Sequence, residues 1–166
     1  EASDMSEDRK RNDVDDDLLE EEDEEDTLEN KYLTFMMEKE EFGVEIRHVR
    51  EIVGMQYITD MPDLPEYVKG VINLRGKVIP VMDVRIRFGL ESQDYDERTC
   101  IIVITVGEQM IGLIVDRVSE VLNIDESCVE EAPDLRKTHI NRYISGLGKV
   151  GDKVKILLNV EKLLFE

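Results

Sequence analysis

Few side chains in this sequence have the types and spacing that binding or catalytic chemistry requires. The acidic segment near the start fills positions 1, 3, 5, 9 and 12 of a calcium-binding loop with Asp13, Asp15, Asp17, Glu21 and Glu24. Position 6 is Leu18, where such a loop needs glycine for its sharp turn. Because a run this acidic matches the pattern easily by chance, a solvated block of like charge is the favoured interpretation.

The histidines and cysteines offer no catalytic or metal-binding pattern. His48 and His139 lack a neighbouring acid–base partner or nucleophile motif, so each is expected at the surface or at a boundary. Cys100 and Cys128 make no disulfide framework, and a metal or redox role would need further ligands at defined spacing. No phosphate-binding or dinucleotide-binding glycine motif occurs either. We therefore expect a binding module rather than an enzyme, with no cofactor and no metal.

One charged residue has a position suited to recognition. Arg75 and Gly76 separate two runs rich in β-branched residues, 71–74 and 78–82, and so predict the turn of a β-hairpin. A charge at a hairpin tip is well placed to meet a partner, although a solvated turn residue with no task is the alternative. Pro80 cannot donate to a strand ladder, so its strand is predicted to be an edge or to be bulged there.

The charge of the chain is unevenly spread. Residues 1–30 hold 16 acids and 3 bases, a net charge of -13, whereas residues 31–166 hold 24 acids and 18 bases, a net charge of -6. A segment with this much like charge and few apolar residues predicts a disordered acidic tail over residues 1–30. The remainder has no basic face for nucleic acid, no apolar run of 18 residues and no secretion signal, so a cytoplasmic protein without a membrane span is expected.

Short apolar runs between polar turns predict a mainly β domain over residues 31–166. Strands are expected at residues 32–37, 42–46, 71–74, 78–82, 100–106, 110–116, 142–150 and 153–160. Short helical or twisted segments are expected at residues 46–53, 66–69, 84–88, 125–131 and 161–165.

The domain contains an internal duplication. Residues 43–53 align with 112–122 at an offset of 69, and residues 67–88 align with 143–164 at an offset of 76. The second block has five identities in 22 positions, and the blocks occur in the same order in both halves. One small β unit used twice, closed into barrels and sharing a core, fits this pattern because a single copy would be marginally stable. The alignment places Arg75 over Gly151, so only the first hairpin tip is charged.

The motifs K-G-V-I-N-L-R-G at residues 69–76 and V-I-P-V-M-D-V-R at residues 78–85 resemble those of the CheW family of bacterial chemotaxis coupling proteins. The resemblance extends over residues 32–166. It implies two packed, pseudo-repeated SH3-like five-stranded barrels with short helices. It also implies a non-enzymatic adaptor that couples the cytoplasmic tips of methyl-accepting chemoreceptors to the regulatory domain of the histidine kinase CheA, at membrane-associated receptor arrays.

The resemblance places the family's partner-binding positions on Val49, Glu51, Gly70, Arg75 and Val121. It implies that Arg75 and Glu51 are the polar anchors of a groove that takes the receptor tip, with the guanidinium held by the carboxylate. Which of the other three positions contacts the receptor and which the kinase stays open. The kinase domain, which has the same two-barrel fold, is expected to pack end to end against this one.

Two other functions remain open at this stage. A CheW-like paralogue would serve a non-flagellar chemosensory pathway with the same domain and different partners. A small ligand-binding barrel would use a cleft between the barrels, and it would need convergent polar groups with perturbed pKa values.

Overall fold

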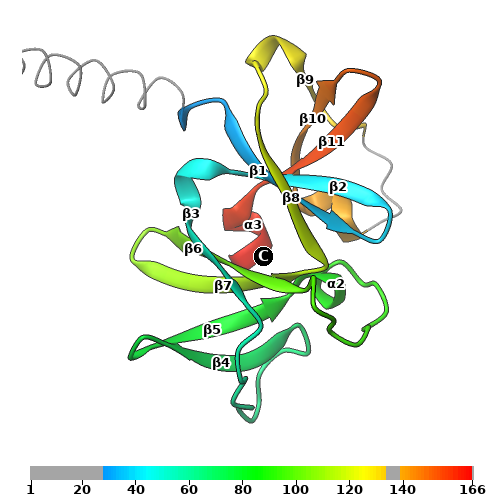
Figure 1. Ribbon diagram of the computed structural model, residues 1–166. Helices are drawn as coiled ribbons and strands as arrows, with labels where there is room; N and C mark the ends of the chain where they lie inside the picture. Colours follow the sequence, from blue (N-terminus) through cyan, green and yellow to red (C-terminus); the bar gives the residue numbers. More distant parts are fainter. Residues whose placement is uncertain (1–27, 134–138, 166) are drawn as a thin grey trace, which may run out of the picture.

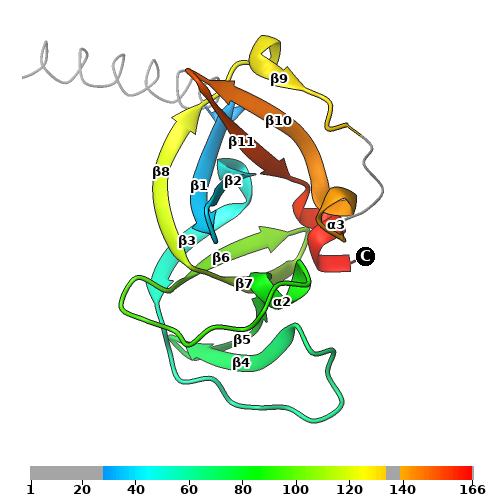
Figure 2. The same ribbon diagram turned by 90° about the vertical axis from the view of Figure 1, so that its right-hand side faces the viewer.

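The computed structural model describes residues 28–133 and 139–165, which form eleven strands and five short helical segments (Figures 1 and 2). The predicted disordered segment, apart from residues 28–30, and the calcium-loop pattern lie outside the described residues. The strands are β1 (Lys31–Met37), β2 (Glu40–Glu45), β3 (Val49–Gly54), β4 (Val68–Leu74), β5 (Lys77–Asp83), β6 (Cys100–Val106), β7 (Gln109–Val115), β8 (Arg117–Asn123), β9 (Val129–Glu130), β10 (Ile144–Val150) and β11 (Lys153–Leu158). The helical segments are η1 (Ile46–His48), α2 (Val84–Arg87), η2 (Glu126–Cys128), η3 (His139–Tyr143) and α3 (Val160–Phe165). In the described part of the chain, no helix is long and apolar enough to cross a membrane.

The strands form two sheets that each curl into an SH3-like barrel. The five-stranded barrel has the order β3-β6-β7-β5-β4, and the six-stranded barrel has the order β8-β1-β2-β11-β10-β9. The chain beyond β3 closes the first, because Thr59 and Val71 exchange backbone hydrogen bonds of 2.8 and 3.0 Å. In the second, β9 pairs with β10 in the corresponding place. The mainly β fold with two barrels is therefore confirmed. Five strands were expected in each barrel, and the second has six because the short β9 forms where the first has only the isolated bridge at Thr59.

Each barrel takes strands from both halves of the sequence. The β1–β2 hairpin lies in the six-stranded sheet with β8 to β11, and the β6–β7 hairpin lies in the five-stranded sheet with β3 to β5. The register follows the offsets of the duplication, since Gly43 pairs with Leu157 as Gly112 pairs with Val81. The β4–β5 and β10–β11 hairpins each stay within one sheet. The two barrels are thus copies that have exchanged their first hairpins.

The prediction that Pro80 lies on an edge strand is wrong, because β5 lies between β4 and β7. Val71, opposite Pro80 on β4, directs its backbone N–H and C=O to Thr59, so this pair needs no hydrogen bond from proline. On the other side, pairing with β7 begins one residue later, at Val81. The ladder is arranged so that the missing N–H costs no hydrogen bond, and the predicted irregularity lies on the partner strand β4 instead.

Two predicted helical segments are also corrected. The helix expected at residues 125–131 is only the 3₁₀ turn η2, after which the chain extends as β9. The helical turn expected at residues 66–69 is replaced by the start of β4 at Val68. The physical reason is closure of the barrels, because pairing with β10 and β5 stabilises extended backbone over the local helical preference.

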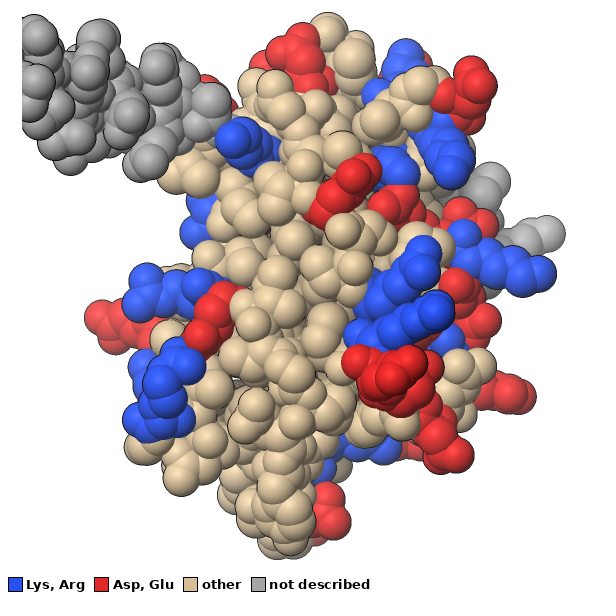
Figure 3. Space-filling view, viewed as in Figure 1, with Lys and Arg blue, Asp and Glu red and all other residues tan. Residues whose placement is uncertain are grey.

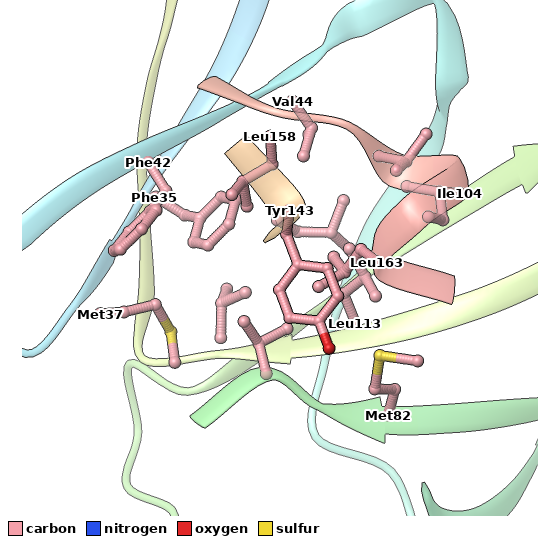
Figure 4. Close-up of a cluster of buried hydrophobic side chains, with 14 of the residues drawn as sticks. Phe35, Met37, Phe42, Val44, Met82, Ile104, Leu113, Tyr143, Leu158 and Leu163 are labelled. Carbon is pink, nitrogen blue, oxygen red and sulfur yellow. The ribbon is translucent and has the colours of Figure 1, made fainter. Parts of the chain in front are cut away.

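The largest core lies between the barrels and belongs to both (Figure 4). Phe42 is its centre, with ring centroids 5.9 Å from Phe35 and 5.2 Å from Phe88. The ring of Phe88 in turn lies 6.1 Å from that of Tyr143. A second, smaller cluster fills the five-stranded barrel alone. The helices α2 and α3, capped by the side chains of Asp83 and Asn159 at equivalent positions, bring apolar residues of both copies into the shared core.

We expect Phe42→Ala to lower the free energy of unfolding by about 3–5 kcal/mol, the usual cost of removing a buried aromatic ring. Because the ring packs in a core common to both barrels, both should lose stability together. Hydrogen exchange of amides in β4 and in β10 measures the two barrels separately. The exposed Val78→Ala variant is the control and should change stability little. Unequal loss of protection in the two strands would contradict a shared core.

Candidate functional site

The tip of the β4–β5 hairpin holds an arginine in a conformation that favours glycine. Arg75 has φ 52° and Gly76 has φ 88°, so both central residues of the two-residue turn are left-handed, as in a type I′ turn. The Asn73 side chain stabilises the turn by accepting a hydrogen bond of 2.8 Å from the Gly76 amide. In the other hairpin Gly151 has φ 61° at the position of Arg75. The first copy therefore keeps a strained arginine where the second has an unstrained glycine.

The Arg75 guanidinium donates a hydrogen bond to the Glu51 carboxylate on β3, which confirms the predicted ion pair. The Arg75 side chain is 69% exposed and that of Glu51 is 30% exposed. A pair this open to solvent contributes only about 0–1 kcal/mol to stability. Its partner-binding role remains a prediction, but folding alone gives little reason for a strained arginine at this position.

A hollow of roughly 420 Å³ surrounds this ion pair, and we refer to it as the tip groove. It is lined by Arg50, Glu51, Leu74, Arg75, Lys77, Ile79 and Met110. Three basic side chains against one carboxylate give the lining a net charge of +2, although residues 31–166 carry -6 overall. Leu74, which is 8% exposed, and the half-buried Met110 supply an apolar floor above the fully buried Ile79. The tip groove is thus apolar at its base and basic at its rim, and Figure 3 shows basic side chains at the left edge of the view, where the β4–β5 tip lies.

The other barrel has a hollow at the equivalent place, which we refer to as the sister hollow. It is lined by Met36, Lys39, Glu40, Glu41, Arg117, Ser119, Glu120, Lys153, Val154 and Lys155. By the two offsets, Ser119 replaces Arg50, while Lys155 and Glu41 replace Ile79 and Met110. Lys155 and Glu41 form an ion pair with side chains only 7% and 17% exposed. An apolar floor with a basic rim is therefore found only in the first of these two hollows.

The other three predicted positions do not join Arg75 and Glu51. Gly70 lies beneath the bridge that closes the barrel, where an added Cβ would be 2.1 Å from the Thr59 carbonyl oxygen. Val49 begins β3 and packs, half-buried, against the shared core. Val121 lies on β8 of the six-stranded barrel and is 50% exposed. Gly70 and Val49 thus have evident structural tasks, whereas Val121 belongs to a separate surface.

The sequence reasoning missed the two exposed bases of the tip groove, Arg50 and Lys77. Arg50 could have been found by the argument that drew attention to Arg75, because the duplication places Ser119 opposite it. Lys77 gave no such signal, since Lys153 is identical in the second copy. Met110 was assigned only to a strand, and nothing in its spacing predicts that it lines a groove.

A buried arginine connects the β1–β2 turn to the junction of β7 and β8. The Arg85 side chain, 7% exposed, donates to Asp116 through Nε at 2.6 Å and through Nη2, and to Glu38 through Nη1. These contacts, first the hydrogen bond to Asp116, raise the pKa of Arg85. Glu38 has φ 57° and donates its amide to Asp116 at 3.0 Å. The cluster fixes the exchanged β1–β2 hairpin against the other barrel.

Arg87 makes a second connection, at the pseudo-symmetric centre. Its guanidinium carbon lies 4.1 Å from the ring centroid of Tyr67 and 4.9 Å from that of Tyr143, which are equivalent at the offset of 76. Its Nε donates to the carbonyl of Leu163, its own equivalent, at 2.8 Å. Cation–π contacts to one tyrosine from each copy stabilise the relative position of the barrels.

The remaining reactive side chains show no built ligand site. His48 is half-buried with its Nε2 3.3 Å from Glu45, and Cys100 and Cys128 are free thiols. The polar cavity beside α2 has a volume of only about 90 Å³, below the usual 300–1,000 Å³ of ligand pockets. Within it the Tyr95 hydroxyl donates to Asp83 at 2.8 Å, and burial raises the pKa of that tyrosine. In residues 28–133 and 139–165 no group of His, Cys, Asp and Glu could hold a metal ion.

Two SH3-like barrels that share a core and present a charged groove define a two-barrel protein-recognition domain. The chain belongs to the CheW-like family, whose CheW-like domain matches residues 31–166. It is 38% identical over 138 residues to a chemotaxis protein CheW of Klebsiella aerogenes, covering 83% of each chain. It is 32% identical over 143 residues to that of Helicobacter pylori, covering 86% of this chain and 85% of the relative. The crystal structure of the scaffolding protein TtCheW from Thermoanaerobacter tengcongensis superposes with a TM-score of 0.76 at 36% identity, covering 82% of this chain and 93% of that one.

Three substitutions at Arg75 separate the strain of the turn from the ion pair. Arg75→Ala and Arg75→Lys keep a left-handed non-glycine residue, so we expect each to change the free energy of unfolding by less than about 1 kcal/mol. Arg75→Gly removes the strain and should raise the free energy of unfolding by about 1 kcal/mol. Urea unfolding of the three variants measures this order. Loss of several kcal/mol in Arg75→Ala would show that the residue is structural.

Proposed function

We propose that this chain is a chemotaxis scaffold protein, an adaptor that couples the cytoplasmic tips of chemoreceptors to the histidine kinase CheA and catalyses no reaction itself. The family match and the named relatives support chemotaxis and scaffolding. The observation that carries the assignment of a working surface is the strained, exposed Arg75 at the rim of a basic groove found in one copy of the duplicated unit. The protein would act in the cytoplasm at receptor arrays.

The receptor tip would bind in the tip groove. Arg75 presents a planar guanidinium with several donors and is already partly oriented by Glu51, so less conformational freedom is lost when a partner binds. The floor of Leu74 and Met110 supplies apolar contact, and arginine anchors at the centre of an interface commonly dominate affinity. Val49 and Gly70 would serve this surface indirectly, by holding β3 and the closing bridge in place.

The kinase would bind a different face. Each barrel exposes apolar residues at equivalent places, Ile52 and Val78 on one and Val121 and Val154 on the other, with exposed fractions of 45, 64, 50 and 48%. Exposed apolar side chains on matched strands suit a partner of the same two-barrel fold, packed barrel against barrel. An adaptor needs receptor and kinase bound at the same time. The tip groove for the receptor and a separate apolar face for the kinase would allow this.

Pull-down with receptor cytoplasmic fragments and CheA, read for both complex formation and kinase activity, tests the proposal. We expect Arg75→Ala to weaken receptor binding about tenfold, the effect of a contact worth about 1.4 kcal/mol. Arg75→Lys should rescue poorly because an ammonium cannot form the planar fork. The control is Arg117→Ala, which removes a base from the sister hollow instead. Normal receptor control of the kinase by Arg75→Ala would contradict the assignment of the tip groove.

Substitutions on the apolar faces test the kinase contact. We expect one of the two variants, Ile52→Asp or Val121→Asp, to weaken CheA binding strongly and to leave receptor binding intact. The reason is that a charge at the centre of an apolar contact is costly to bury. The positions are equivalent in the two barrels, so each variant is the control for the other. Full CheA binding by both variants would exclude these faces.

A further inference from the structure

The lining of the tip groove carries a net positive charge, whereas the chain as a whole is acidic. One segment of the same chain has the opposite charge and matches this groove. Residues 13–26 hold eleven acidic residues and no basic residue. Within this run stand Leu18 and Leu19, an apolar pair flanked on both sides by carboxylates. We propose that residues 13–26 dock on the tip groove of the same molecule, with the leucine pair over its apolar floor and the flanking acids at its basic rim.

The chemistry of the groove matches this occupant in two ways. The cations at the rim are Arg50, Arg75 and Lys77, and only Arg75 has a carboxylate partner among the described residues. Leu74 and the half-buried Met110 form the floor above the buried Ile79, and they offer apolar contact to a leucine pair. An acidic segment without apolar residues would match the rim alone, and an apolar segment would match the floor alone.

The length of chain before Leu28, the first described residue, is sufficient. An extended chain spans at most about 3.3 Å per residue, so the ten residues from Leu28 back to Leu18 reach about 33 Å. Tyr32, four residues after Leu28, pairs with Glu45, and Glu45 precedes Arg50 at the rim of the groove by only five residues. Residues 13–26 are therefore long enough to reach the tip groove.

The sister hollow shows why one site is favoured. Its lining carries four bases, Lys39, Arg117, Lys153 and Lys155, against three acids, for a net charge of +1. Lys155 is already paired with Glu41, and this ion pair occupies the place of the apolar floor. The duplication thus supplies an internal control, in which Lys77 and Lys153 occupy equivalent positions in two hollows that differ in charge and floor.

Zero-length carbodiimide cross-linking of the full chain tests the docking, because it joins carboxylates to lysine amines in direct contact. At low salt we expect Lys77 to form at least about threefold more cross-links to residues 13–26 than Lys153 does. The preference should disappear at 1 M salt, where the Debye length falls to about 3 Å. It should also disappear in a full chain that carries Leu18→Ser and Leu19→Ser, which keeps all eleven carboxylates and removes the apolar contact. A second variant, in which the eleven acids are replaced by Asn and Gln, has no carboxylate in residues 13–26 to cross-link and is used for the binding experiment alone. Mixing isotopically labelled and unlabelled protein distinguishes cross-links within one molecule from those between two.

Three results would overturn the proposal: equal cross-linking of Lys77 and Lys153, cross-links mainly between molecules, or none to Lys77. The consequence for coupling rests on the proposed function. If residues 13–26 occupy the tip groove, the apparent affinity for the receptor falls in proportion to the fraction of molecules whose groove is free. The Asn and Gln variant should therefore bind receptor fragments at least about threefold more tightly than the unaltered chain. Equal affinity despite Lys77 cross-links would overturn this competition alone. Absence of receptor binding by both proteins would instead contradict the proposed function.

Discussion

The apolar core between the barrels is the constraint on which the rest of the structure depends. Each copy of the duplicated unit is short, and a β domain of that size buries too small a fraction of its surface to be stable alone. The exchange of first hairpins removes this difficulty, because Phe42 on β2 of the six-stranded barrel packs against Phe35 of that barrel and against Phe88, which follows the five-stranded one. The Arg85 cluster and the Arg87 cation–π contacts then fix the orientation that the core permits. The groove at the β4–β5 tip is therefore held by a framework far more stable than its own contacts.

That framework explains how a strained residue persists at the hairpin tip. The Arg75–Glu51 pair is too exposed to offset the left-handed conformation by much, and Gly151 in the second copy shows the unstrained alternative. A stable barrel can carry the strain because the turn opens only when the paired strands separate. Strain that the local contacts do not explain supports the proposed recognition role of Arg75.

Alternating apolar residues predicted the strands, and the duplication predicted two copies of one β unit, since both depend on local pattern. The Arg75–Glu51 contact was implied by the family resemblance and is present. Hairpin exchange could not be predicted, because the same strand pattern fits consecutive and exchanged barrels equally well. Pro80 was misplaced for a related reason: a hydrogen bond that Val71 makes to Thr59 is invisible without the closed barrel. The difference between Arg87 and its equivalent Leu163 is visible in the duplication, but the contacts of Arg87 with Tyr67 and Tyr143 exist only once the barrels are packed.

The divergence of the two copies is concentrated where a second groove would otherwise exist. Positions that build the shared core stay apolar in both copies, as Met82 and Leu158 do. At the floor of the groove, by contrast, Ile79 and Met110 of the first barrel are replaced by Lys155 and Glu41 at the equivalent positions of the second. A buried ion pair is rarely a gain in stability over apolar residues of similar size, so its presence argues for specificity rather than for folding. Because the sister hollow is charged at its base, only one of these two equivalent hollows has an apolar floor and a basic rim. A duplicated scaffold can thus present one site of this kind, which an adaptor joining one partner to a different one requires.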